Sequence, residues 1–192
     1  MERTPTDAAA TDPELWDRAA GGDHSAFEEL FQRHAEAVWN HAYRLTGAWS
    51  QAEDLTSATF LLAWRKRREV RLVRDSALPW LYAVAGNLAR TEFRRVGRFN
   101  RALRRVPSSD TTPDHADEVA VRVDDDRRVR AVLEAVRALP KSEREIVELC
   151  LIGDLSTTDA AALLGLAEPS IRSRVSRAKA RLRTLLEGKI ND

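Results

Sequence analysis

The chain has 192 residues, 43% of them hydrophobic, and its 31 Lys and Arg residues nearly balance 30 Asp and Glu. This composition supports one ordinary domain or two small ones and argues against global disorder. No apolar run approaches the roughly 20 residues of a membrane span, and the acidic N-terminus does not resemble a secretory signal. The single cysteine, Cys150, has no partner for an internal disulfide. We therefore expect a cytoplasmic protein with no membrane partner.

Charge is segregated along the chain although the net charge is only +1. Residues 1–64 carry 4 basic and 11 acidic side chains, residues 65–105 carry 13 and 3, and residues 169–192 carry 7 and 2. Arginine, which suits bidentate contact with phosphates and bases, supplies 27 of the 31 cations. The two basic blocks predict two sites for a polyanion, although two solvated helix faces would give the same pattern.

Helical periodicity dominates the first half of the chain, whereas strand signals are weak, so we predict an all-α protein. Residues 1–12 are expected to be disordered, and residues 13–98 are expected to form a first helical domain. Its helices are predicted to begin at Asp12-Pro13, at Ser25 with the capping partner Glu28, near Gln51 and at Pro79. Gly47 is the expected C-terminal cap of the second helix.

An acidic stretch rich in Ser, Thr, Asp and Pro interrupts this periodicity, and we predict a flexible linker over residues 99–125. Such a linker could let the two domains close on each other or on an inhibitor. Residues 126–187 are expected to form a second, smaller helical domain. Its second helix is predicted to start at Ser142 with Glu145 and to end at Gly153, with Cys150 on its apolar stripe.

The last two predicted helices carry the clearest motif. Ser156 caps a short helix, Gly165-Leu166-Ala167 makes a turn, and Pro169 begins a second helix, which together is the arrangement of a helix-turn-helix. The N-terminal half of the second helix reads the DNA major groove in that motif. At about 100° per residue, the side opposite the apolar stripe holds Ser170, Arg172, Ser173, Ser176 and Arg177. Phosphate contact is expected at the flanks and further along, from Arg174, Lys179, Arg181 and Arg183. An ordinary helical hairpin with a basic face is the alternative.

The helix after Pro79 offers a second nucleic-acid candidate. Trp80 precedes Asn87 by seven residues, so the two share a side of this helix. An aromatic ring beside a basic face suits single-stranded nucleic acid, although Trp80 could equally be a core residue. The polar side chains on this face are Asn87, Arg90, Thr91 and Arg94.

Four segments in order resemble the extracytoplasmic-function (ECF) sigma factors of bacterial RNA polymerase, which have two helical domains called regions 2 and 4. The first two are LWDRAAGGDHSAFEELFQRH and AEDLTSATFLLAW, similar to regions 2.1 and 2.2. The other two are LPWLYAVAGNLARTEFRR, similar to region 2.4, and LPKSEREIVELCLIGDLSTTDAAALLGLAEPSIRSRVSRAKARLR, similar to region 4.2. The resemblance covers about residues 13–98 and 126–186.

The resemblance implies that region 2 binds core RNA polymerase and opens the promoter at its −10 element. The residues that would dock on the β′ clamp helices are Glu53, Asp54, Leu55, Phe60 and Trp64. This chain has Ser57-Ala58 where the family usually has Gln-Glu, which removes two polar contacts. A flipped −10 base would be held near Arg74, Asp75 and Ser76, and the strand would meet Trp80, Asn87, Arg90 and Arg94.

The resemblance further implies that region 4 contacts the β flap and reads the −35 element as duplex DNA. The residues at matching positions are Ser170, Arg172, Ser173, Arg174, Ser176, Arg177 and Lys179. No cofactor or metal is implied, the free protein is expected to be a monomer, and an anti-sigma factor is an expected further partner.

Three other classes of function compete with this interpretation. An enzyme is disfavoured because no glycine-rich phosphate loop is present and the four histidines, His24, His34, His41 and His115, show no HExxH pattern. A stand-alone helix-turn-helix regulator that binds duplex DNA without polymerase would not need the AEDLTSATF segment. A protein that only sequesters a partner would not need two basic blocks.

Overall fold

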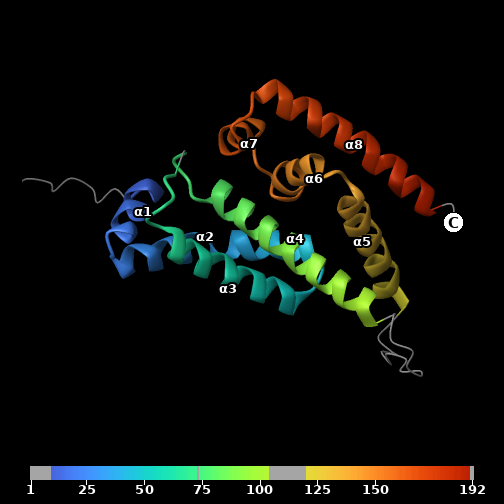
Figure 1. Ribbon diagram of the computed structural model, residues 1–192, viewed down its shortest axis with the longest axis horizontal. Helices are drawn as coiled ribbons and strands as arrows, with labels where there is room; N and C mark the ends of the chain where they lie inside the picture. Colours follow the sequence, from blue (N-terminus) through green and yellow to red (C-terminus); the bar gives the residue numbers. More distant parts are fainter. Residues whose placement is uncertain (1–9, 73, 104–119, 191–192) are drawn as a thin grey trace, which may run out of the picture.

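The computed structural model describes residues 10–72, 74–103 and 120–190, and all regular structure within them is helical (Figure 1). This confirms the predicted all-α fold with two domains. The N-terminal domain contains α1 (Asp12–Ala20), α2 (His24–Thr46), α3 (Trp49–Lys66) and α4 (Leu78–Leu103). The C-terminal domain contains α5 (Ala120–Ala138), α6 (Lys141–Val147), the π-helical η1 (Glu148–Ile152), α7 (Thr157–Leu164) and α8 (Glu168–Ile190). Within the described ranges, no helix combines the length and hydropathy that crossing a membrane requires.

The core of the N-terminal domain lies where α2 packs against α1, α3 and α4. Trp16 is 2% exposed, and its indole Nε1 donates a hydrogen bond of 3.0 Å to the Val70 carbonyl after α3. A second cluster lies further along α2 and α3. The largest apolar side chains of the first cluster are Leu15, Trp16, Leu30, Val38, Phe60 and Leu81.

The ends of α2 show where local sequence signals were sufficient and where they were not. Gly47 ends α2 in the left-handed conformation, with φ 71°, and its N–H donates to the Tyr43 carbonyl, which confirms the predicted cap. The N-terminal cap is Asp23 rather than Ser25, because the Asp23 carboxylate accepts a hydrogen bond of 3.1 Å from Ala26 N. Ser25 instead donates its hydroxyl to the same carboxylate at 2.7 Å.

Asp12 links three parts of the N-terminal domain, although residues 1–12 were expected to be disordered. Its side chain is 4% exposed and accepts hydrogen bonds of 2.8 Å from Arg33 and from the backbone N–H of Ala77. His34 Nε2 lies 2.5 Å from the second carboxylate oxygen. Residues 10–12 therefore belong to the folded domain, while residues 1–9 lie outside the described part of the chain.

The C-terminal domain has two small clusters that share α8. Ile171 and Ala178 of α8 are fully buried, as the apolar stripe predicted. The helix predicted from Ser142 begins at Lys141, with Pro140 at its N-cap, and becomes the π-helical η1 before the predicted end at Gly153. Cys150 packs against the cluster of Ile146 and Ile171, in agreement with the expected core position.

Helices enter the predicted linker from both ends. α4 continues to Leu103, five residues past the predicted domain boundary at 98, and α5 begins at Ala120 rather than near residue 126. Residues 104–119, which include His115, lie outside the described part of the chain. The acidic linker predicted over 99–125 is therefore partly helical.

The two domains pack directly on each other. η1 contacts α2 and α4, and α7 contacts α4. In Figure 1, α6 and α7 lie on the same side of α4. Ile152 of η1 packs against clusters of both domains. This closed arrangement determines which side chains of α4 can reach a partner.

Candidate nucleic-acid interface

The helix-turn-helix of α7 and α8 forms as predicted. Ser156 caps α7, since its hydroxyl accepts from Asp159 N at 3.0 Å, and Gly165 ends it in the left-handed conformation with φ 63°. The outer face of α8 exposes Arg172, Ser173, Ser176, Arg177 and Lys179, whereas Ser170 and Arg174 are half-buried. Five of the seven predicted side chains are thus on the surface that a DNA groove could approach.

Two carboxylates organise the cations of α8. Arg172 lies 3.1 Å from Glu168, whose same oxygen accepts a hydrogen bond of 3.0 Å from Thr157 on α7. Arg181 lies 3.6 Å from Glu143 of α6, which ties the later part of α8 to its own domain. Arg172 is therefore held on the N-terminal half of α8, on the face that reads bases in this motif.

The face of α4 is only partly available. Asn87, Thr91 and Arg94 are exposed, but Arg90 is 9% exposed and lies beneath η1. Trp80 is half-buried and packs edge-on against Trp16, with ring centroids 5.3 Å apart. The tryptophan is therefore part of the domain's core edge, which leaves only part of its ring for stacking.

Arg90 is the centre of an ionic cluster between the domains. One guanidinium nitrogen contacts the Glu148 carboxylate, and the other lies 2.5 Å from Asn87 Oδ1 and 3.7 Å from Glu145. Burial raises the pKa of Glu148 to about 7, although the charges of Arg90 and Arg144 oppose that rise. A partly desolvated carboxylate thus faces a cation that the sequence assigned to nucleic acid.

The loop before α4 also meets the C-terminal domain. Arg74 lies 3.4 Å from Asp159 and donates a hydrogen bond of 3.3 Å to the backbone carbonyl of Thr158, and both residues are on α7. Asp75 is exposed, and the Ser76 hydroxyl accepts a hydrogen bond of 3.2 Å from Leu78 N at the start of α4. Ser76 therefore bonds the first residue of α4, while Arg74 and Asp75 are exposed side chains of this loop.

The exposed side of α3 differs from the predicted docking set. Glu53 and Asp54 are exposed, but Leu55 and Phe60 are 8% and 5% exposed and belong to the two core clusters. Trp64 is half-buried beneath Arg67, whose guanidinium carbon lies 3.5 Å from the ring centroid. Phe60 thus cannot present its ring to a partner without leaving the core.

Two exposed apolar side chains near Glu53 and Asp54 were not predicted from the sequence. Leu61 is 51% exposed and follows Asp54 by seven residues, a helical spacing that could have revealed it. Trp49 is 64% exposed, its ring centroid lies 4.5 Å from that of Trp39, and its indole donates to Glu53 at 2.8 Å. No periodic signal marks Trp49, because it occupies the first position of α3.

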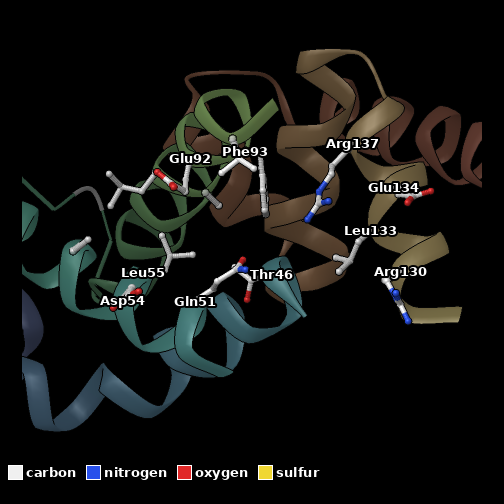
Figure 2. A pocket seen from close by; sticks show the side chains of 14 residues that line it. Thr46, Gln51, Asp54, Leu55, Glu92, Phe93, Arg130, Leu133, Glu134 and Arg137 are labelled. Atoms are coloured by element: carbon white, nitrogen blue, oxygen red, sulfur yellow. The ribbon is translucent and has the colours of Figure 1, made fainter. Parts of the chain in front are cut away.

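A groove of about 890 Å³ runs beside this face, between the domains. Side chains of α3 and α4 line one side and side chains of α5 line the other (Figure 2). Asp54, Leu55 and Ala58 belong to its lining, so the groove is continuous with the exposed acidic face of α3. The ring of Phe93 in the groove stacks beneath the Arg137 guanidinium at 3.8 Å.

Two histidines and the cysteine outside these surfaces pack against neighbouring side chains. In residues 10–72, 74–103 and 120–190, no cluster of three or more His, Cys, Asp or Glu side chains could hold a metal ion. The ring of His24 packs on Trp64, and the buried ring of His41 stacks on Tyr82 with centroids 4.3 Å apart. Burial also raises the pKa of the Cys150 thiol, which disfavours its reactive thiolate.

Comparison with known proteins shows the family of this chain. Residues 30–99 match the family model described as Sigma-70 region 2, and residues 129–182 match Sigma-70, region 4. The chain is 31% identical to the ECF RNA polymerase sigma factor SigL of Mycobacterium tuberculosis, over 88% of this chain and 93% of that protein. It is 35% identical to the ECF RNA polymerase sigma factor SigE of Mycolicibacterium smegmatis, over 87% of this chain and 65% of that protein.

Solved structures show the same architecture. CnrH in complex with the cytosolic domain of CnrY matches with a TM-score of 0.62 and 26% identity, over 92% of this chain and 97% of that one. The sigma factor RpoE in complex with the anti-sigma factor NepR from Bartonella quintana matches with a TM-score of 0.54 and 27% identity, over 84% and 96%. From its two family matches, its curated relatives and its two-domain helical fold, the chain belongs to the ECF sigma factors of RNA polymerase, which direct promoter-dependent initiation of transcription.

Proposed function

We propose that this sigma factor divides its work among three surfaces. The exposed acidic face of α3 docks on core RNA polymerase, the α4 face binds the opened −10 strand, and the outer face of α8 reads the −35 duplex. The observation that carries the proposal is the exposure of Arg172, Ser173, Ser176 and Arg177 on the N-terminal half of α8. Arginine reads guanine through O6 and N7, and serine can meet bases or phosphates.

The docking surface in this proposal is centred on Glu53 and Asp54. These carboxylates are exposed and flanked by the apolar side chains of Leu61 and Trp49, an arrangement that suits a basic partner helix such as the β′ clamp helices. Trp64 remains at the edge of this surface. Leu55 and Phe60 support it from within the core, so they act through packing rather than contact.

For the −10 element, the proposal keeps the exposed Asn87 and Arg94 as strand contacts and Arg74 with Asp75 as loop contacts. Arg90 joins them only when the domains separate, because its guanidinium contacts Glu148 in the closed protein. Trp80 contributes the exposed part of its ring. Flipping a base out of the stack costs on the order of a few kcal/mol, which such contacts must offset.

Regulation and location complete the proposal. RpoE of Bartonella quintana was solved with an anti-sigma factor, and we propose an anti-sigma partner here too. The groove beside α3 shares Asp54 with the docking face, so a partner seated there would compete with core polymerase. We place this non-enzymatic regulator in the cytoplasm, where its polymerase acts, and expect a monomer in the free state. A regulator acting on duplex DNA without polymerase is disfavoured because both sigma regions are present.

Run-off transcription with purified core polymerase on a pool of native promoter fragments tests the proposal. Transcripts that depend on this protein are expected, and their start sites would reveal the promoter elements. Asp54→Arg is expected to reduce co-purification with core polymerase by reversing a charge in the docking face. Asp17→Arg, which makes the same change at an exposed position of α1, is the matched control. Normal core binding by Asp54→Arg would place the docking surface elsewhere.

A further inference from the structure

The contact between the domains covers the nucleic-acid face of α4 at one position. Arg90 is 9% exposed although its neighbours Asn87 and Arg94 are open to solvent. Its guanidinium contacts the Glu148 carboxylate of η1 and lies 3.7 Å from Glu145 of α6. The C-terminal domain therefore supplies two carboxylates to a cation that the proposed function gives to DNA.

Two glycines lie where α4 meets η1. A Cβ atom on Gly86 of α4 would lie 3.0 Å from Glu148 Oε2. A Cβ atom on Gly153, after η1, would lie 2.8 Å from the Leu149 carbonyl oxygen of η1 and 3.0 Å from the Tyr82 ring of α4. A side chain at Gly86 would therefore crowd the Glu148 carboxylate, which would have to shift by a few tenths of an ångström.

Two other bonds across the contact have the same polarity. Arg44 of α2 donates a hydrogen bond of 2.9 Å to the Ile152 carbonyl. Arg74 lies 3.4 Å from Asp159 of α7. At each of these contacts the N-terminal domain supplies the cation and the C-terminal domain supplies the oxygen acceptor. The C-terminal domain thus offers the same kind of acceptor that a nucleic acid would offer.

We propose that the C-terminal domain latches the free protein closed, with the carboxylates of Glu148 and Glu145 occupying the place of the DNA strand at Arg90. This inference rests on the proposed function of the α4 face. Phosphate and carboxylate oxygens compete for the same guanidinium, so the promoter strand reaches Arg90 only after the domains separate. Arg74 is released from α7 by the same movement. The free sigma factor is thereby kept from occupying single-stranded DNA until a partner holds its domains apart.

The test compares the free wild-type protein with Glu148→Ala in two measurements. Small-angle scattering gives the radius of gyration, and fluorescence anisotropy gives the binding of a labelled single-stranded oligonucleotide of mixed sequence. Glu148→Ala is expected to expand the protein and to tighten binding by about tenfold, because apparent affinity scales with the fraction of binding-competent molecules. Glu187→Ala removes the same charge from an exposed position of α8 and should change neither the radius of gyration nor the affinity by a comparable amount.

Two further variants keep the test decisive if Glu148→Ala perturbs folding, which circular dichroism would reveal. Gly86→Leu adds a side chain that crowds the Glu148 carboxylate while both charges remain, and leucine favours a helix more than glycine does. It should open the protein as Glu148→Ala does. The charge exchange Arg90→Glu with Glu148→Arg should return the radius of gyration towards the wild-type value, whereas each single change should increase it.

The outcomes separate the latch from the function on which it rests. If folded Glu148→Ala and Gly86→Leu stay compact, or open without binding the oligonucleotide more tightly than wild type, the latch is refuted. If the variants open but no protein with an intact Arg90 binds the oligonucleotide at all, the proposed role of the α4 face is refuted, and the inhibitory role of the contact falls with it.

Discussion

Removing the Asp12 carboxylate is expected to destabilise the N-terminal domain and displace the loop before α4. Asp12 is 4% exposed and accepts hydrogen bonds from Arg33 and Ala77 N, both at 2.8 Å, with His34 at 2.5 Å. Asp12→Ala leaves the buried His34 and the Ala77 N–H without this acceptor. The same loop carries Arg74, so the change should also weaken binding of single-stranded DNA.

The magnitude follows from these partners. A hydrogen bond to a charged group contributes about 1.5–3 kcal/mol. Arg33 is 32% exposed and keeps its ion pair with Glu29 at 2.7 Å, so losing its bond to Asp12 costs little. The bonds of Ala77 and His34 therefore dominate, and the free energy of unfolding should fall by about 3–5 kcal/mol. Asp17→Ala, on the exposed side of the same helix, should change it by about 0.5 kcal/mol or less.

Urea denaturation followed by tryptophan fluorescence measures this loss in the relevant domain. All 5 tryptophans lie in the N-terminal domain, at positions 16, 39, 49, 64 and 80. Burial alone would raise the pKa of Asp12, but the Ala77 N–H, the charge of His34 and the bond from Arg33 together hold it below its usual 3.8. The stabilisation is therefore present above pH 3.8 and is lost as the pH falls further. A loss below about 1 kcal/mol at neutral pH would refute the role of Asp12 as the link among α1, α2 and the loop.

Three other changes test separate parts of the structure. Burial, with the charge of Arg44, lowers the pKa of His41 from 6.5 to about 4. Since the unfolded chain then binds the extra proton, stability should fall as the pH drops from 6.5 towards 4, by up to ~3 kcal/mol, and His41→Phe should flatten this slope in urea denaturation. Gly47→Ala should cost about 1–2 kcal/mol in the same assay, because φ is 71° there; an unchanged midpoint would contradict that conformation. Arg177→Ala should weaken binding of the −35 duplex by about 1–3 kcal/mol. Arg183→Ala, further along α8, should weaken binding about equally for all duplex sequences, because only a charge is lost. If Arg177→Ala also weakened binding equally for all duplex sequences, Arg177 would not be a base-reading residue.

The local sequence was enough to predict the helix-turn-helix and the face of α8 that carries its cations. Apolar spacing of three and four residues makes the buried side of a helix readable, and Ile171 and Ala178 are fully buried as that spacing requires. The cap at Gly47 and the one at Ser156 were equally readable, since each acts through the backbone of its own helix end. The family resemblance put Phe60 in the docking set, although Phe60 is 5% exposed and its neighbour Leu61 is 51% exposed. Similarity over a whole region does not state which of two neighbouring residues faces the core.

The sequence by itself determined the helical class, the order of the domains, and the exposed side of α8 that carries its cations, since these depend on contacts within about one or two helical turns. Only the tertiary structure decided that Asp12 is a buried link, that Leu55 and Phe60 are core, and that Arg90 is covered. Arg90 and Glu148 are 58 residues apart, and their contact depends on how one domain packs on the other. Periodicity carries no information about that packing, because the same charged residue suits a solvated face, a DNA contact or an ion pair between domains.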